Sequence, residues 1–215
     1  MHQYFTTNTI TEIVCFTICS FCLFKEKNPY WRTFIVYLFI VCLTEMGGIH
    51  LRLMKISNSM LYAGFLFVEC TVVSAFFYHL FAKYKHKITL FYSWMGIFVM
   101  AALWELFSGS FEHFPYRTAA LMSVVFVIAS LYFYMLVIRD ENFRRLGTYP
   151  AFWIVNGILF FYFGSTACNV FFNYLLQTET GTITLSIRYI VFTVLNILLY
   201  GCWSYAFICR YLQRN

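Results

Sequence analysis

The chain has 215 residues and a formal net charge of +6; 61% of its residues are hydrophobic and only 11% are charged. Soluble domains carry about 25% charged residues, so this composition excludes an ordinary soluble protein and indicates one whose solvent is mostly lipid. The basic residues lie at the ends of apolar stretches instead of in one patch, which argues against nucleic acid as a partner.

Seven long apolar stretches, separated by short polar loops, fill almost the whole sequence. A span takes about 20 apolar residues, so seven spans take about 140 and leave only loops and ends. The predicted helices cover residues 5–24, 33–51, 59–82, 88–107, 118–138, 150–176 and 189–209. The predicted fold class is therefore all-α: a polytopic membrane protein with a seven-transmembrane-helix bundle, forming a single transmembrane domain over residues 1–215.

The predicted helices differ in strength. The first is the weakest, because it begins with the polar sequence FTTNTITE and is strongly apolar only from Ile13 to Phe24. The fifth has no charged residue between Thr118 and Ile138. All three prolines lie at predicted helix boundaries, so the broken helices typical of transporter binding sites are not expected.

The distribution of lysine and arginine indicates the orientation in the membrane. Eleven lie on one side of the predicted membrane: Lys25, Lys27, Arg32, Lys83, Lys85, Lys87, Arg139, Arg144, Arg145, Arg210 and Arg214. Four lie on the other side: Arg52, Lys55, Arg117 and Arg188. Because cytoplasmic loops are the richer in these residues, the N-terminus is predicted outside and the C-terminus inside.

Four glutamates lie inside predicted helices: Glu12, Glu45, Glu69 and Glu105. A charge at the centre of a span costs about 2.5–3.5 kcal/mol, so such residues usually face the interior of the bundle. With the rise per residue of an α-helix, Glu45, Glu12 and Glu69 are about 9, 10 and 15 Å below the outer surface. Glu105 lies within a turn of that surface. The alternative for each is a neutral glutamic acid bonded to a neighbouring helix, or a side chain that reaches water.

Polar residues of the last two predicted helices fall in the same outer layer. Asn169 and Asn173 share one helix face with Tyr162 and Thr166, and Asn196 lies about 10 Å below the outer end of its helix. The sequence thus predicts an outward-facing polar cavity. Its candidate ligand-binding residues are Glu12, Glu45, Tyr62, Glu69, Asn169, Asn173 and Asn196. Asparagines that only join neighbouring helices by hydrogen bonds are the alternative.

Other chemistry receives little support from the sequence. All eight cysteines lie in apolar stretches, without a metal-type spacing or a disulfide framework. The histidines are too scattered to join Glu45 and Glu69 in a metal site. Motifs of the HExxH, GxSxG and phosphate-loop types are absent, and the last predicted helix has no lysine for a retinal. We therefore expect no catalytic residue, no metal and no cofactor.

Two stretches, 44–69 and 150–174, carry features of a known group of proteins. The matching features are Glu45 with a glycine after it, Asn58 and Tyr62 at the start of a helix, Glu69, and the frame of Phe152, Trp153, Gly157 and Gly164. In these features the chain resembles uncharacterised seven-helix bacterial inner-membrane proteins of about this length, often encoded beside sensor histidine kinases. The resemblance implies a bacterial inner (cytoplasmic) membrane and a signalling neighbourhood, and it implies no activity.

Together these observations favour an integral membrane sensor or receptor-like module. It would bind a small ligand in the outer polar layer and pass a helix shift to a separate signalling partner such as a histidine kinase. An enzyme is not favoured, because no catalytic cluster is evident. Two alternatives stay open. A small-solute transporter or channel needs a polar path to the inner face, and an intramembrane enzyme would use Glu45 and Glu69 as an acid–base pair.

The orientation can be tested with reporter fusions. A reporter that is active only outside the cytoplasm is expected to be inactive at Asn215 and active within the 108–117 loop, because of the eleven-to-four asymmetry in basic residues. An exported C-terminal tail, or a cytoplasmic 108–117 loop, would contradict the predicted orientation.

Overall fold

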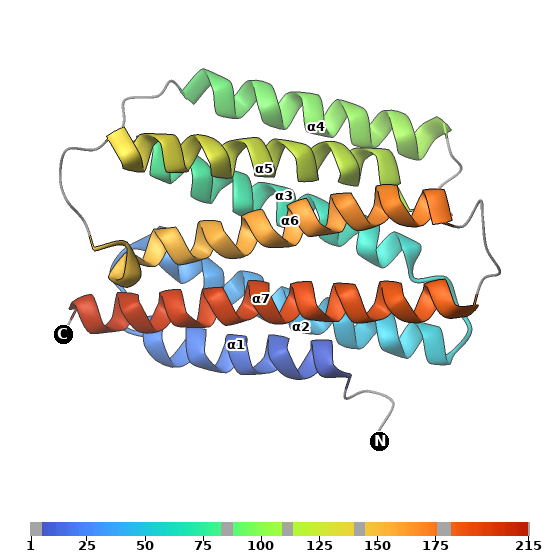
Figure 1. Ribbon diagram of the computed structural model, residues 1–215, viewed down its shortest axis with the longest axis horizontal. Helices are drawn as coiled ribbons and strands as arrows, with labels where there is room; N and C mark the ends of the chain where they lie inside the picture. Colours follow the sequence, from blue (N-terminus) through green and yellow to red (C-terminus); the bar gives the residue numbers. More distant parts are fainter. Residues whose placement is uncertain (1–5, 83–87, 109–113, 140–144, 176–181, 215) are drawn as a thin grey trace. The chain divides into compact units, whose positions relative to one another are not determined.

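The computed structural model describes residues 6–82, 88–108, 114–139, 145–175 and 182–214, and it describes side chains in these ranges except at 88–90, 169–175 and 182–188. The described residues form seven α-helices and one short 3-10 helix, with no strand (Figure 1). The elements are α1 (Thr7–Leu23), α2 (Pro29–Leu53), α3 (Ser59–Ala82), α4 (Ile88–Ser108), α5 (Tyr116–Arg139), η1 (Leu146–Thr148), α6 (Pro150–Leu175) and α7 (Thr182–Arg214). The predicted all-α fold of seven helices is confirmed.

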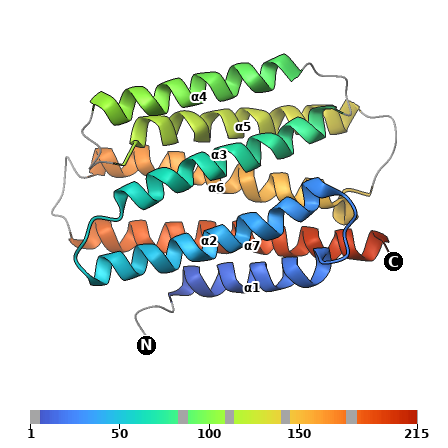
Figure 2. The same ribbon diagram turned by 180° about the vertical axis from the view of Figure 1, so that it is seen from behind.

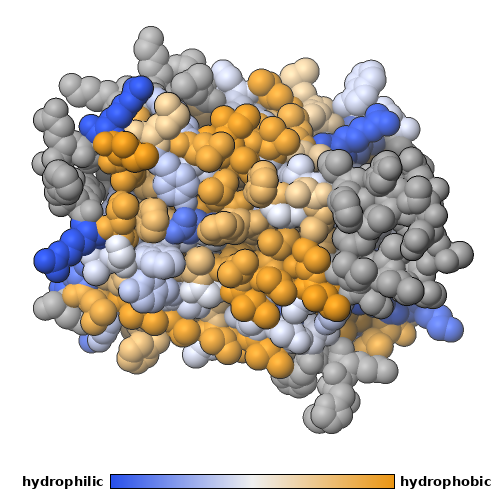
Figure 3. All heavy atoms as spheres, in the orientation of Figure 1, coloured by the Kyte–Doolittle hydropathy of each residue, from blue (hydrophilic) through white to orange (hydrophobic). Residues whose placement is uncertain are grey.

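Six of these helices, α2 to α7, are long and apolar enough to cross a membrane. On the face seen in Figure 3, hydrophobic side chains cover most of the described surface, and the strongly hydrophilic ones lie toward the helix ends. The remaining helix, α1, has 17 residues and spans about 25 Å, less than the hydrocarbon thickness of about 30 Å. Length and composition therefore indicate an integral membrane protein in which α1 is the weakest span.

The observed helix ends follow local capping more than hydropathy. α3 has the predicted bounds, but α2 begins at Pro29, four residues earlier than predicted. Pro29 occupies the first helical turn, and the Asn28 side chain accepts a hydrogen bond from the Tyr30 N–H at 3.0 Å. α7 begins at Thr182, seven residues before the predicted start, because the helix continues through Arg188.

The chain divides into two compact units, Met1–Met122 and Ser123–Asn215, and each is described by itself. In the first unit, α1 packs on α2, α2 on α3 and α3 on α4 (Figures 1 and 2). The Phe76 ring of α3 meets Phe34 of α2 edge to face at 5.4 Å. The Trp94 indole of α4 donates a hydrogen bond to the Ser74 hydroxyl of α3 at 3.0 Å. Aromatic contacts and a hydrogen bond thus help to hold α2, α3 and α4 together.

In the second unit, α6 and α7 form a closely packed pair. The Trp203 indole of α7 is 2% exposed and donates a hydrogen bond to the Ile154 carbonyl of α6 at 3.2 Å. A Cβ on Gly157 would lie 2.9 Å from Trp203 Cδ1 and 3.1 Å from the Leu199 carbonyl oxygen. Gly164 lies in the same way against Leu195. Small residues on α6 therefore let α7 approach closely, which is how transmembrane helices commonly pack.

Replacing Gly157 by alanine tests this contact. We expect Gly157→Ala to lower the free energy of unfolding by about 1–3 kcal/mol, because a methyl group would lie 2.9 Å from the buried Trp203 ring and 3.1 Å from the Leu199 carbonyl oxygen, so α6 and α7 would have to shift apart. Gly201→Ala on α7 is the matched control, since nothing lies within 4 Å of its Cβ position, and it is expected to be neutral or slightly stabilising. Equal stability of the two variants, measured by denaturant unfolding in detergent, would contradict the close packing.

Candidate functional site

Three of the four intramembrane glutamates come together in the first unit. Glu12 lies on α1, Glu45 on α2 and Glu69 on α3, so each of three neighbouring helices contributes one carboxyl group. Glu12 and Glu45 interact electrostatically with one another. Tyr37 of α2 interacts with both Glu12 and Glu69. We call these four residues, together with Tyr62, the glutamate cluster.

A hydrogen bond between α2 and α3 organises one end of the glutamate cluster. The Tyr62 hydroxyl donates to Glu45 Oε2 at 3.1 Å, and the Tyr62 ring lies directly against Gly48. A Cβ on Gly48 would overlap the Tyr62 hydroxyl and would lie 2.8 Å from Cζ. Gly48 is three residues after Glu45 and so lies on the same helix face. The glycine therefore provides the space through which Tyr62 reaches Glu45.

Glu12 is the most buried of the four glutamates inside predicted helices, with 6% of its surface exposed. Its Oε2 atom accepts no hydrogen bond from any residue in the described part of the chain. Asn8 lies one turn earlier on the same face of α1. Its buried Oδ1 atom also accepts no hydrogen bond from the described residues. Buried polar atoms are normally hydrogen-bonded, so these two acceptors, one helical turn apart, can each take a hydrogen bond from a further donor.

Tyr37 is a member of the cluster that sequence reasoning missed. It is 4% exposed, and its ring stacks on Phe65 of α3 with centroids 6.1 Å apart. With 17 tyrosines in the chain, residue type alone gave no signal. The spacing along the sequence did offer a signal, because Tyr37, Thr44 and Gly48 follow the i, i+7, i+11 pattern of one helix face. In the structure all three residues are buried.

The predicted site residues of the last two helices belong to the second unit. Asn169 and Asn173 lie in α6, and their side chains are outside the described residues. Asn196 lies in α7 and is half-buried. That these asparagines share a polar layer with the glutamates stays a prediction.

Glu105, the fourth glutamate, caps a helix. Its Oε1 atom accepts a hydrogen bond from the Arg117 N–H at 2.9 Å. Its Oε2 atom accepts two from Thr118, at 2.8 Å from the N–H and 2.7 Å from the hydroxyl. The residues before α5 are Phe114 and Pro115, whose side chains cannot cap its first turn. The sequence shows that a local cap is missing but not which residue replaces it; the contact ties the end of α4 to the start of α5.

The described residues contain no group of three or more histidine, cysteine, aspartate or glutamate side chains that could hold a metal ion. The glutamate cluster therefore offers carboxylates and aromatic rings but no built metal centre. Comparisons of the chain with protein-family models, curated proteins and solved structures gave no match.

The contact between Gly48 and Tyr62 can be tested by a double-mutant cycle. Gly48→Ala is expected to push Tyr62 away from Glu45, and Tyr62→Phe removes the hydrogen bond directly. Because both changes act on one contact, their effects on unfolding free energy should be non-additive by at least about 0.5 kcal/mol. Gly64→Ala on α3, where nothing lies within 4 Å of the Cβ position, is the control. Strict additivity would show that Gly48 and Tyr62 act independently.

Proposed function

We propose that the chain is an integral-membrane, receptor-like module that binds a small, positively charged organic ligand at the glutamate cluster. The observation that carries this proposal is the pair of buried acceptors, Glu12 Oε2 and Asn8 Oδ1, for which the described residues supply no donor. An ammonium group brings up to three N–H donors for these acceptors and a positive charge for the Glu12 carboxylate.

The charge of the cluster supports a cationic ligand. Glu12, Glu45 and Glu69 bring three carboxyl groups to the cluster, and Arg52 interacts electrostatically with Tyr62. Ionised carboxylates among apolar helices are costly unless a cation or a proton joins them. The rings of Tyr37 and Phe65 stack beside Glu69 and offer π faces, which attract organic ammonium groups.

The proposed output is a shift of α1 against α2 that a separate protein detects. α1 and α2 share the cluster toward one end and a short turn at the other, where the Asn28 N–H donates to Glu26 Oε1 at 3.1 Å. A ligand that pulls Glu12 toward Glu45 would also displace the other end of α1 relative to α2 at that turn, because a helix moves as a rigid rod. The proposed partner is a cytoplasmic or membrane signalling protein such as a histidine kinase, in a bacterial inner membrane.

A thermal-shift screen tests the proposal. Purified protein in detergent is melted with a panel of primary amines, quaternary amines and polyamines, each paired with a neutral analogue of the same shape. A cation that binds is expected to stabilise the protein by about 2.7 kcal/mol at 100 times its dissociation constant. Glu12→Gln and Glu69→Gln should abolish this stabilisation, because they remove charge but keep shape. Glu105→Gln, which changes a helix cap outside the cluster, should retain it.

Two results would overturn this reading. If no cation of the panel stabilises the protein beyond its neutral analogue, the cluster is not a cation site. If Glu69→Gln responds as wild type while Glu69→Leu destabilises the protein, Glu69 serves as a hydrogen-bonding partner between helices. Uptake of a bound cation into sealed proteoliposomes would instead favour the transporter hypothesis.

A further inference from the structure

A second site of the first unit lies away from the glutamate cluster. A pocket of about 640 Å³ is formed where α4 ends and α5 begins. Its walls are mainly apolar and include Ala101, Trp104 and Leu121, and Arg117 lies among the lining residues. The volume falls within the range of about 300–1,000 Å³ that is usual for ligand pockets.

The acidic side chain of this pocket, Glu105, already accepts hydrogen bonds from the protein. Both carboxyl oxygens of Glu105 accept hydrogen bonds from the first turn of α5, and the Thr118 hydroxyl donates one of them. These bonds also occupy the N–H groups that an incoming anion could otherwise use at this helix N-terminus. The positively charged group of this pocket is the guanidinium of Arg117, which interacts electrostatically with Glu105 while the Glu105 oxygens bond to the backbone and to Thr118.

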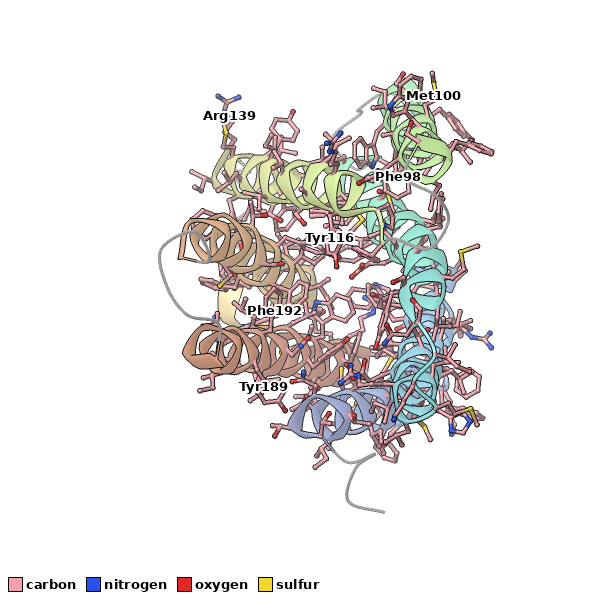
Figure 4. All side chains as sticks on the ribbon, turned by 90° about the vertical axis from the view of Figure 1, so that its right-hand side faces the viewer. Phe98, Met100, Tyr116, Arg139, Tyr189 and Phe192 are labelled. Atoms are coloured by element: carbon pink, nitrogen blue, oxygen red, sulfur yellow. The ribbon has the colours of Figure 1, made fainter. Side chains whose placement is uncertain are left out.

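The surroundings of the pocket are those of a membrane surface. Trp104 is 77% exposed and Tyr116 is 67% exposed, although both line the pocket. Tryptophan and tyrosine at the ends of transmembrane helices typically lie at the level of the lipid headgroups. In Figure 4, Phe98 and Met100 lie on opposite sides of α4, and Phe98 is fully buried whereas Met100 is 73% exposed. Most of α4 therefore faces outward, toward the bilayer, beside the pocket.

We propose that this pocket binds an anionic phospholipid, with its phosphate at Arg117 and an acyl chain against Ala101, Trp104 and Leu121. The phosphate complements the positive charge of Arg117, and Arg is well suited to phosphate because its planar fork donates two parallel hydrogen bonds. The apolar walls complement the chain. The lipid would stabilise the junction of α4 and α5 that Glu105 already caps.

Lipid binding can be measured by native mass spectrometry of the delipidated protein, titrated with phosphatidylglycerol or phosphatidylcholine. One Arg near a lipid surface contributes about 1 kcal/mol, so Arg117→Gln is expected to weaken phosphatidylglycerol binding about five-fold. Arg139→Gln, which removes an exposed arginine at the other end of α5, is the matched control and should bind as wild type. Phosphatidylcholine should bind more weakly than phosphatidylglycerol to the wild-type protein.

A second variant tests the pocket without changing charge. Ala101→Leu fills part of the apolar wall and should weaken phosphatidylglycerol binding while leaving the melting temperature without lipid close to that of wild type. The proposal fails if Arg117→Gln binds as wild type, if Arg139→Gln loses as much affinity as Arg117→Gln, or if both lipids bind equally to the wild type. Competition by millimolar inorganic phosphate would point to free phosphate as the ligand and would also overturn it.

Discussion

The high cost of a carboxyl group among apolar helices constrains the whole first unit. For Glu105 this cost is offset by hydrogen bonds, because its two oxygens accept three of them from α5. Glu45 meets it in part through Tyr62. Glu12 is more buried than Glu105, yet one of its oxygens has no donor among the described residues. Groups of the same chemistry thus have different roles, and the completeness of their hydrogen bonding distinguishes a helix cap from a candidate site.

Close approach of helices is the second constraint, and glycine provides it in both units. Gly48 of α2 leaves space for the Tyr62 ring next to Glu45. Gly157 of α6 leaves space for the Trp203 side chain and the backbone of α7. In each case an aromatic residue with a polar group reaches a partner on the next helix, a carboxylate for Tyr62 and a backbone carbonyl for Trp203. Small residues in lipid therefore serve hydrogen bonding as well as packing, because only close helices bring such partners within reach.

The sequence predicted what depends on local composition and missed what depends on distant partners. The seven helices, and α3 to the residue, followed from apolar stretches between polar loops. Glu45 and Tyr62 were both candidate site residues, but their hydrogen bond was not predicted. The α5 cap by Glu105 could not be predicted, because it joins residues separated by an unpredicted loop conformation. The early start of α7 was missed because Arg188 was taken as a loop residue, whereas helix geometry tolerates one charge near a membrane surface.

The weakness of α1 as a membrane span has a structural reason that bears on the glutamate cluster. Its buried face carries Thr9 and Glu12, followed by Cys15, Cys19 and Cys22, so polar residues occupy the positions that usually hold large apolar ones. Such a helix gains less from packing than its neighbours, and it keeps an unpaired acceptor at Glu12 among the described residues. A ligand that satisfies this acceptor would stabilise the seated position of α1 by its own binding free energy. The short helix with the polar face is thus the part of the unit whose position the proposed cation would control most directly.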